Sequence, residues 1–189
     1  MLTRFILFLI AFSLLLSLPA LAQNTQALQA EAEKAIQAFS KELKAELRAV
    51  LKAGGPAQAI KVCQQKAPEI AKSVSAKTGW QIGRTSLRLR NPDNAPDAWE
   101  QGVLENFQIQ AAEGAKPGGL MYSDFIQEDG KTVFRFMQGI KTEGLCLKCH
   151  GSQISPRVKE RLVELYPYDR ATGFKAGELR GAFTLEKQL

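Results

Sequence analysis

Apolar residues recur at three- and four-residue steps through residues 27 to 52, with polar and charged residues filling the positions between them. The apolar positions are Leu28, Ala32, Ala35, Ile36, Phe39, Leu43, Leu47, Val50 and Leu51. This spacing is typical of one face of an amphipathic helix. Gly54, Gly55 and Pro56 follow, and we expect them to end that helix.

A second helical stretch comes next and carries the first cysteine. Its apolar face consists of Ile60, Cys63, Ala67, Ile70 and Val74. Pro68 lies inside this stretch. Because proline lacks an N–H and its ring crowds the carbonyl of residue 64, we expect the helix to kink or restart there. Cys63 is therefore predicted on the buried side of the helix, next to an irregular turn.

The pattern changes to period two after Trp80, which predicts a strand. The alternating positions are Thr85, Leu87 and Leu89 on one side and Arg84, Ser86, Arg88 and Arg90 on the other. Trp80 and Ile82 fall on the opposite parity, so we expect a β-bulge at Gly83.

After the loop NPDNAP, a further helix is predicted from the apolar stripe Trp99, Val103, Leu104 and Phe107. Asp93 or Asn94 is expected to cap this helix, with Pro96 in its first turn.

The last part of the chain predicts a hairpin, a short helix and a final strand. Residues 119–140 are expected to form the hairpin, which turns at Asp129 and Gly130. The short helix runs from Pro156 to Tyr166. In the final strand one face is formed by Leu179, Gly181, Phe183 and Leu185. Hairpins with peripheral helices predict an α+β fold with an antiparallel sheet.

The first 22 residues have the layout of a secretory signal peptide. Arg4 precedes an apolar run from Phe5 to Leu18, and Ala20, Leu21 and Ala22 form a small-x-small cleavage pattern. The run is shorter than the roughly 20 residues of a membrane span, although an uncleaved N-terminal anchor is the alternative. We expect a periplasmic protein, or one of the thylakoid lumen if the source is cyanobacterial, with no membrane span after cleavage.

The charge narrows the classes of partner. Removing Arg4, the only charged residue of the predicted signal peptide, lowers the formal net charge from +6 to +5. The sequence contains no recognised nucleic-acid-binding motif and no basic run, so we expect no nucleic-acid partner. Acidic partners, or acidic groups of a bound cofactor, fit this charge better.

The strongest chemical signal is CLKCH, which uses two of the three cysteines and the only histidine of the chain. C-x-x-C-H is the signature of covalent c-type haem attachment. Two thiols at this spacing add to the two vinyl groups on one edge of the porphyrin, and the next residue offers an imidazole to the iron. Cys146 and Cys149 are thus the predicted thioether sites for one covalent haem c, and His150 is the predicted proximal ligand.

Three other interpretations compete: a disulfide between Cys146 and Cys149, a zinc site that adds Cys63 and His150 to them, and a chance match. The thioredoxin-type CxxC belongs to a βαβ context, which this sequence lacks. Adjacent residues such as Cys149 and His150 point in different directions and rarely bind one ion together. Three cysteines in an oxidising compartment also leave one thiol outside any set of disulfides.

The second axial ligand is left open by the residues alone. Haem iron takes a ligand on each face, and the chain has no second histidine. Cys63, Met121 and Met137 are the candidates, because lysines are normally protonated. A lone cysteine is more often a small buried hydrophobe than a ligand.

Three arginines of the predicted strand, Arg84, Arg88 and Arg90, are candidates for contacts with the haem propionates. The alternative is that they form a solvated strand face.

Three separated stretches resemble the exported c-type haem proteins with a PAS-like domain, a family once classed as a domain of unknown function. The stretches are VCQQKAPEIAKSVSAKTGWQIGRTSLRLRNPDNAPDAWE, CLKCHG and LYPYDRATGFKAGELRGAFTL, and the resemblance covers nearly all of residues 55 to 187. The same domain occurs as the extracytoplasmic sensing part of bacterial signalling proteins. The resemblance implies a PAS-like antiparallel sheet with N-terminal and flanking helices. It also implies a haem bound by His150 and by the cysteine of the VCxxxAP segment, Cys63.

We accordingly divide the mature chain into a helical region, residues 23–78, and a PAS-like haem-binding domain, residues 79–189, packed as one unit. The expected function is redox sensing or low-potential electron transfer, because a thiolate stabilises ferric iron. A sensor of NO or CO that displaces Cys63 is the alternative. A peroxidase-like enzyme ranks third, since no histidine remains for acid–base chemistry. We expect no substrate turnover, and a redox or signalling protein as partner.

Overall fold

The computed structural model describes the backbone of residues 17–189 and the side chains from residue 24 onward. Most of the predicted signal peptide, residues 1–22, therefore lies outside the described residues, and its cleavage stays a prediction. None of the helices in the described part combines the length and the apolar character needed to cross a membrane.

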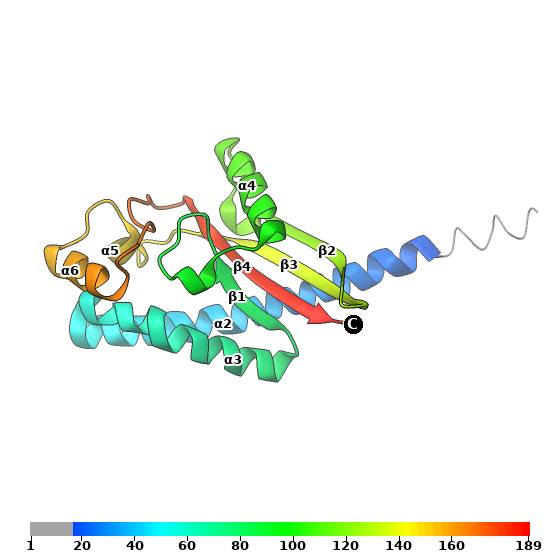
Figure 1. Ribbon diagram of the computed structural model, residues 1–189, viewed down its shortest axis with the longest axis horizontal. Coiled ribbons are helices and arrows are strands. Elements are labelled where there is room, and N and C mark those ends of the chain that lie inside the picture. Colours follow the sequence, from blue (N-terminus) through cyan, green and yellow to red (C-terminus); the bar gives the residue numbers. More distant parts are fainter. Residues whose placement is uncertain (1–16) are drawn as a thin grey trace, which may run out of the picture.

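A long helical arm begins the fold (Figure 1). Helix α2 spans Ser17–Lys61 and is kinked at Gly55, whose φ of 75° and ψ of −176° lie outside the helical region. The predicted break at Gly55 and Pro56 is thus present, and the chain continues as helix beyond it. A π-helix, η1 (Val62–Lys66), and helix α3 (Ala67–Thr78) follow.

Four strands form one antiparallel sheet in the order β1-β4-β3-β2. They are β1 (Gln81–Thr85), β2 (Met121–Glu128), β3 (Lys131–Lys141) and β4 (Leu179–Gln188). The hairpin of β2 and β3 turns at Asp129 and Gly130, as predicted, with φ of 50° and 75°. The predicted α+β class with an antiparallel sheet is confirmed, and this architecture agrees with a PAS-like fold.

The two faces of the sheet are covered by different helices (Figure 1). Helices α2 and α3 pack on one face through a cluster that includes Phe39, Trp80 and Phe134. Helix α4 (Ala98–Ala112) packs on the other face, where Phe107 and Met137 belong to a second cluster. Helix α6 (Pro156–Leu165) packs against α2 away from the sheet.

Strand β1 is shorter than predicted, and the predicted bulge at Gly83 is wrong. Gly83 pairs regularly with Thr184, and the strand ends at Thr85. The chain leaves the sheet there because the Ser86 hydroxyl bonds to the Arg180 carbonyl and accepts the Arg88 N–H. A side chain thus takes the hydrogen bonds that a continued strand would need.

A bulge does occur, but in β4. Ile140 pairs with Gly181 and Lys141 pairs with Leu179, which leaves Arg180 as the extra residue. The parity of the strand changes at this point. Leu179 therefore joins the cluster on the α4 side, whereas Phe183 packs on the α2 side. The prediction that these two side chains share a face is wrong for this reason.

The cap of α4 also differs from the prediction. Asp97 is the N-cap residue, and it forms a capping box with Glu100: each side chain accepts the backbone N–H of the other. Asp93 and Asn94, the predicted caps, lie in a short 3₁₀ turn, η2 (Pro92–Asn94), that precedes the helix.

Candidate functional site

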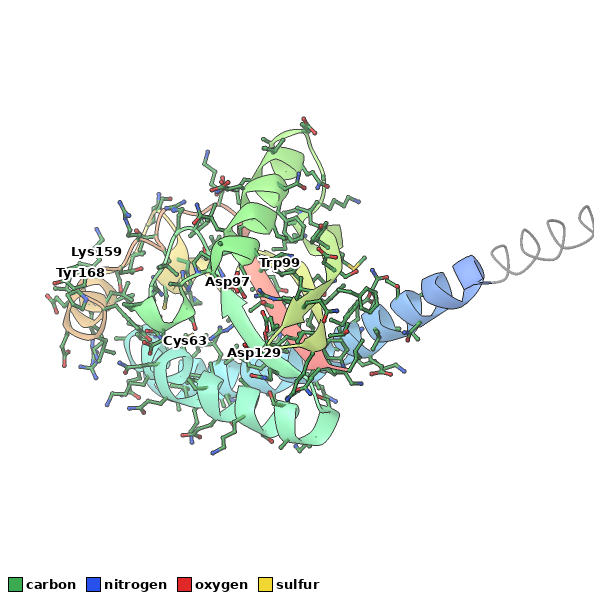
Figure 2. The ribbon with its side chains drawn as sticks, turned by 45° about the vertical axis from the view of Figure 1, so that its right-hand side comes forward. Cys63, Asp97, Trp99, Asp129, Lys159 and Tyr168 are labelled. Atoms are coloured by element: carbon green, nitrogen blue, oxygen red, sulfur yellow. The ribbon has the colours of Figure 1, made fainter. Side chains whose placement is uncertain are left out.

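A cavity of about 440 Å³ opens between α2, η1, the segment after β1 and the CLKCH motif. It contains every cysteine and the histidine of the chain: Cys63, Cys146, Cys149 and His150 line it. Figure 2 shows Cys63 on the helices, on the side of the sheet opposite to Asp97 and Trp99 beside α4. The fold thus gathers the predicted thioether sites, the predicted proximal ligand and the third thiol around one space.

The CLKCH motif forms a single helical turn directly after β3. Helix α5 spans Leu147–His150, and the N–H of His150 donates to the carbonyl of Cys146 over 2.8 Å. Gly151 ends the turn; a Cβ at this position would lie 2.6 Å from the carbonyl oxygen of Leu147. The three cysteines, all within the described residues, are free thiols. Burial raises the pKa of the Cys149 thiol to about 11.

The imidazole of His150 is held by the backbone. Its Nδ1 lies 2.7 Å from the carbonyl oxygen of Ala171, a partner that requires Nδ1 to carry the proton. Its Nε2 then carries the lone pair. Burial, together with the charges of Arg180 and Arg90, lowers the pKa of His150 well below its usual value. The ring is therefore neutral, which is the form that binds a metal.

Arg90 ties the motif to a neighbouring segment. It forms an ion pair with Asp169, with Nη2 and Oδ2 2.9 Å apart and both side chains less than a tenth exposed. Nη2 also donates to the carbonyls of Cys149 at 2.6 Å and Ala171 at 3.2 Å. Nη1 lies 3.2 Å from Nε2 of His150. Because Nδ1 carries the proton, Nε2 accepts this N–H. Arg90 therefore holds the backbone of the motif, and it would have to leave Nε2 for that nitrogen to bind a metal.

The predicted strand arginines are not equivalent, although all of them line the cavity. The guanidinium of Arg88 donates to the carbonyls of Arg170 and Thr172 and lies 4.1 Å above the ring of Phe174. Like Arg90, it is occupied by protein groups. Arg84 makes one recorded contact, 5.4 Å above the ring of Phe39.

Arg180 is a cavity residue that the sequence pattern missed. The bulge in β4 turns it toward the cavity, where its buried Nε has no partner among the described residues. A glycine inside a strand often marks a bulge, so Gly181 was the available signal. The acid lining the cavity is Glu143, and its carboxylate is bound 2.6 Å from Nζ of Lys44. The cavity thus has excess positive charge and fits a group that carries anionic substituents.

Cys63 lies within the π-helix η1. The N–H of Ala67 donates to the carbonyl of Val62, five residues back, and Pro68 has no N–H to continue a regular ladder. The predicted irregularity is therefore present as a widened turn, which is a frequent feature of functional sites. Burial raises the pKa of Tyr166 to about 12, and the neighbouring Cys63 adds to this shift. The two side chains face the same cavity.

The alternative ligands lie elsewhere. Met137 is fully buried in the cluster on the α4 side, and Met121 is 48% exposed at the start of β2. Neither lines the cavity, so the structure gives no support to them as axial ligands. Among the side chains described, from residue 24 onward, no three of His, Cys, Asp or Glu converge on a point that could hold a metal ion. The zinc interpretation therefore gains no support from the structure.

Comparisons with known proteins show the family of the chain. A search of curated protein sequences finds no match. The crystal structure of the cyanobacterial heme-protein Tll0287 superimposes with a TM-score of 0.55 at 25% sequence identity, over 82% of this chain and 93% of that chain. A family model described as Tll0287-like matches residues 18–186. The resemblance inferred from the sequence motifs is confirmed: the chain belongs to the Tll0287-like family.

Proposed function

We propose that this chain is an exported c-type haem protein that acts in redox sensing or low-potential electron transfer. In this proposal Cys146 and Cys149 would form the thioether links to the haem, and His150 and Cys63 would hold its iron. One observation carries the proposal: the neutral imidazole of His150 lines the same cavity as all three thiols. The structural similarity to a heme-protein adds support, and the cavity volume lies within the roughly 300 to 1,000 Å³ of typical ligand sites.

The chain's own residues have separate tasks. When bound, haem supplies an iron centre that gains and loses one electron. The carbonyl of Ala171 retains the Nδ1 proton and so keeps the lone pair of His150 on Nε2. Arg90 fixes the backbone on either side of this bond. Cys63 contributes a thiolate, which donates electron density and stabilises the ferric state.

A second function, sensing of a gas such as NO or CO, is favoured by the placement of Cys63. A π-turn lacks the regular hydrogen bonds of an α-helix, and this one precedes a proline. A ligand held on such a turn is easier to displace than one held on a regular helix. A peroxidase-like activity has less support, because the acid lining the cavity, Glu143, is already paired with Lys44. We propose no substrate turnover.

The proposed location is outside the cytoplasm, and the proposed partner is a redox or signalling protein. Exposed Lys141 and Lys148 both line the cavity. They give its surroundings a positive charge that favours an acidic partner.

The test is a spectroscopic redox titration of the chain produced together with a haem-ligation apparatus. We expect covalent haem by mass, and its complete loss in a double variant with Cys146→Ser and Cys149→Ser. Cys63→Ala is expected to change the ferric spectrum and to raise the reduction potential, because the thiolate that stabilises ferric iron is removed. Met137→Leu, a change in the cluster on the opposite face of the sheet, is the matched control and should alter neither.

Two results would refute parts of the proposal. A colourless product with free thiols at Cys146 and Cys149 would refute haem attachment. A Cys63→Ala variant with the spectrum and potential of the unmodified protein would refute thiolate ligation. Binding of CO by the reduced protein, with loss of the thiolate spectrum, would favour gas sensing over electron transfer.

A further inference from the structure

We infer that Arg84 and Arg180 form a two-arginine site for carboxylates and that, if the proposed function holds, it binds the propionates of the haem. This pair replaces the set Arg84, Arg88 and Arg90 expected from the sequence. The inference depends on how the chain brings Arg180 to the cavity and on which cavity arginines keep free donors.

The backbone around Arg180 is shaped to place its side chain there. The bulge opposite Ile140 and Lys141 inserts Arg180 as an extra residue. The next residue, Gly181, has a φ of 154°, and a Cβ there would lie 2.3 Å from the carbonyl oxygen of Thr85. The hydroxyl of Ser86 donates to the Arg180 carbonyl over 2.8 Å. The bulge, the glycine and the hydrogen bond from Ser86, none of which a regular strand needs, together fix the backbone position of Arg180.

The guanidinium of Arg180 is left without a counter-ion. Among the described residues it forms no ion pair and no hydrogen bond, and its Nε is fully buried. Burial and the neighbouring charge of Arg84 both lower the pKa of Arg180. Arg180 as a whole is half-buried, and a partly desolvated guanidinium without a partner is a favourable place for an anion to bind.

The residues that the structure describes do not supply that anion. Arg88 and Arg90 also line the cavity, but carbonyl oxygens and Asp169 occupy their donors. Glu143 is engaged by Lys44. Arg84 and Arg180 are the cavity arginines to which the described residues give no anion or carbonyl acceptor. Two cations side by side match a ligand with two negative charges, and the guanidinium fork matches carboxylates in particular.

The other residues that line the cavity indicate the chemical character of the ligand. Apolar side chains line much of the cavity: Leu43, Leu47 and Leu51 of α2 together with Ile140 and Phe183. The ligand is therefore apolar over most of its surface and anionic at one edge. Haem, with two propionates on one edge of an apolar ring, has this character.

The test uses the haem-loaded full-length chain with Arg180→Gln, Arg84→Gln and the matched control Arg88→Gln. The readouts are the resonance Raman bands of the haem propionates and the reduction potential. We expect the propionate bands to shift in Arg180→Gln and Arg84→Gln, because these bands respond to hydrogen bonds on the carboxylates. The reduction potential should also fall, since a nearby positive charge favours the electron-rich state. Arg88→Gln should leave the propionate bands unchanged.

The outcomes are separable from those that test the proposed function. An unmodified chain that takes up no haem refutes the proposed function and removes the ligand of this inference. Haem-loaded variants whose propionate bands match those of the unmodified protein refute the inference alone. If Arg180→Gln yields no folded protein, the propionate bands of Arg180→Lys test the inference instead. This variant keeps the charge but not the fork, so the propionate bands should still shift, and unshifted bands would again refute the inference.

Discussion

Two arginines on opposite faces of the same sheet, the buried Arg135 and the half-buried Arg180, have contrasting surroundings. On the α4 side, Nη2 of Arg135 lies 2.7 Å from Asp97 and 3.4 Å from Glu100, and the guanidinium stacks 4.3 Å from the ring of Trp99. On the cavity side, the part of the chain that the structure describes offers Arg180 neither an acid nor a carbonyl acceptor. The first arrangement completes its own charge balance. The second leaves the guanidinium available to a group from outside the chain.

This contrast indicates that the α4 side of the sheet contributes to stability and that the cavity side contributes to binding. The α4 side is closed: Glu100 also accepts a hydrogen bond of 2.6 Å from the hydroxyl of Thr184, which ties the helix to β4. Changes there are expected to affect the free energy of unfolding and to leave the haem spectrum unaltered. Changes on the cavity side are expected to alter the spectrum or the reduction potential. The following predictions test this division.

The largest effect on stability is expected from Arg135→Gln. Removing the guanidinium leaves Glu100 buried without its counter-charge, which should lower the free energy of unfolding by about 3 kcal/mol. Chemical denaturation measures this change, and the visible spectrum should stay the same. Lys77→Gln, which removes an exposed ion pair with Glu42, is the control and should cost less than about 1 kcal/mol. Equal losses in both variants would contradict the comparison.

A smaller loss is expected from Gly181→Ala, at the bulge between the two faces. The added Cβ would press on the carbonyl oxygen of Thr85, and the positive φ of 154° disfavours alanine. We expect a loss of about 2 kcal/mol, together with a shift in the reduction potential because Arg180 is displaced. Gly102→Ala is the matched control: this exposed helical position has open space, so alanine should stabilise by about 0.5 to 1 kcal/mol. If Gly181→Ala left the free energy of unfolding and the reduction potential unchanged, the bulge would tolerate a side chain and the prediction would be wrong.

The smallest effect is expected from Asp97→Ala, which removes the cap of α4 and should cost about 1 kcal/mol at neutral pH. Burial alone would raise the pKa of Asp97, but hydrogen bonds from the Glu100 N–H and from Arg135 outweigh it and hold the pKa below its ordinary value of 3.8. The charge therefore stabilises the fold above that value, and the contribution is lost as the pH falls through the folded-state pKa.

Thermal unfolding of the Asp97 variants at several pH values measures this dependence. The difference between the unmodified protein and Asp97→Ala should shrink below about pH 4. Asp97→Asn keeps a capping oxygen without the charge and should be closer to the unmodified protein at pH 7. A difference that stays constant down to acid unfolding would contradict the role of the carboxylate.

Patterns confined to one element were predicted well. The stripe of α4, the hairpin turn at Asp129 and Gly130, and the helix from Pro156 follow from periodicity and turn chemistry. The C-x-x-C-H spacing is local too, and it directed attention to the three residues that line the cavity.

Features that depend on a distant partner were missed. Alternation in the sequence continues past Thr85, but the hydroxyl of Ser86 bonds to the β4 backbone and the strand ends. The parity of β4 reverses at Arg180 because of its register against β3, and the residues of β4 taken alone do not specify that register. The proposal that Cys63 is an iron ligand also depended on the family resemblance, since an apolar helical face predicts a buried thiol equally well.

The order of the strands has a consequence for biogenesis. Strand β4 follows the CLKCH turn in the sequence, lies inside the sheet and is the strand with which β1 pairs. Until residues 179–188 have emerged, β1 has no place in the sheet, and the segment after it has no Arg180 backbone to hold it. A nascent chain that has not yet reached residue 179 therefore lacks one wall of the cavity, although it already contains the CLKCH turn. Premature termination before residue 179 would remove an interior strand of the sheet.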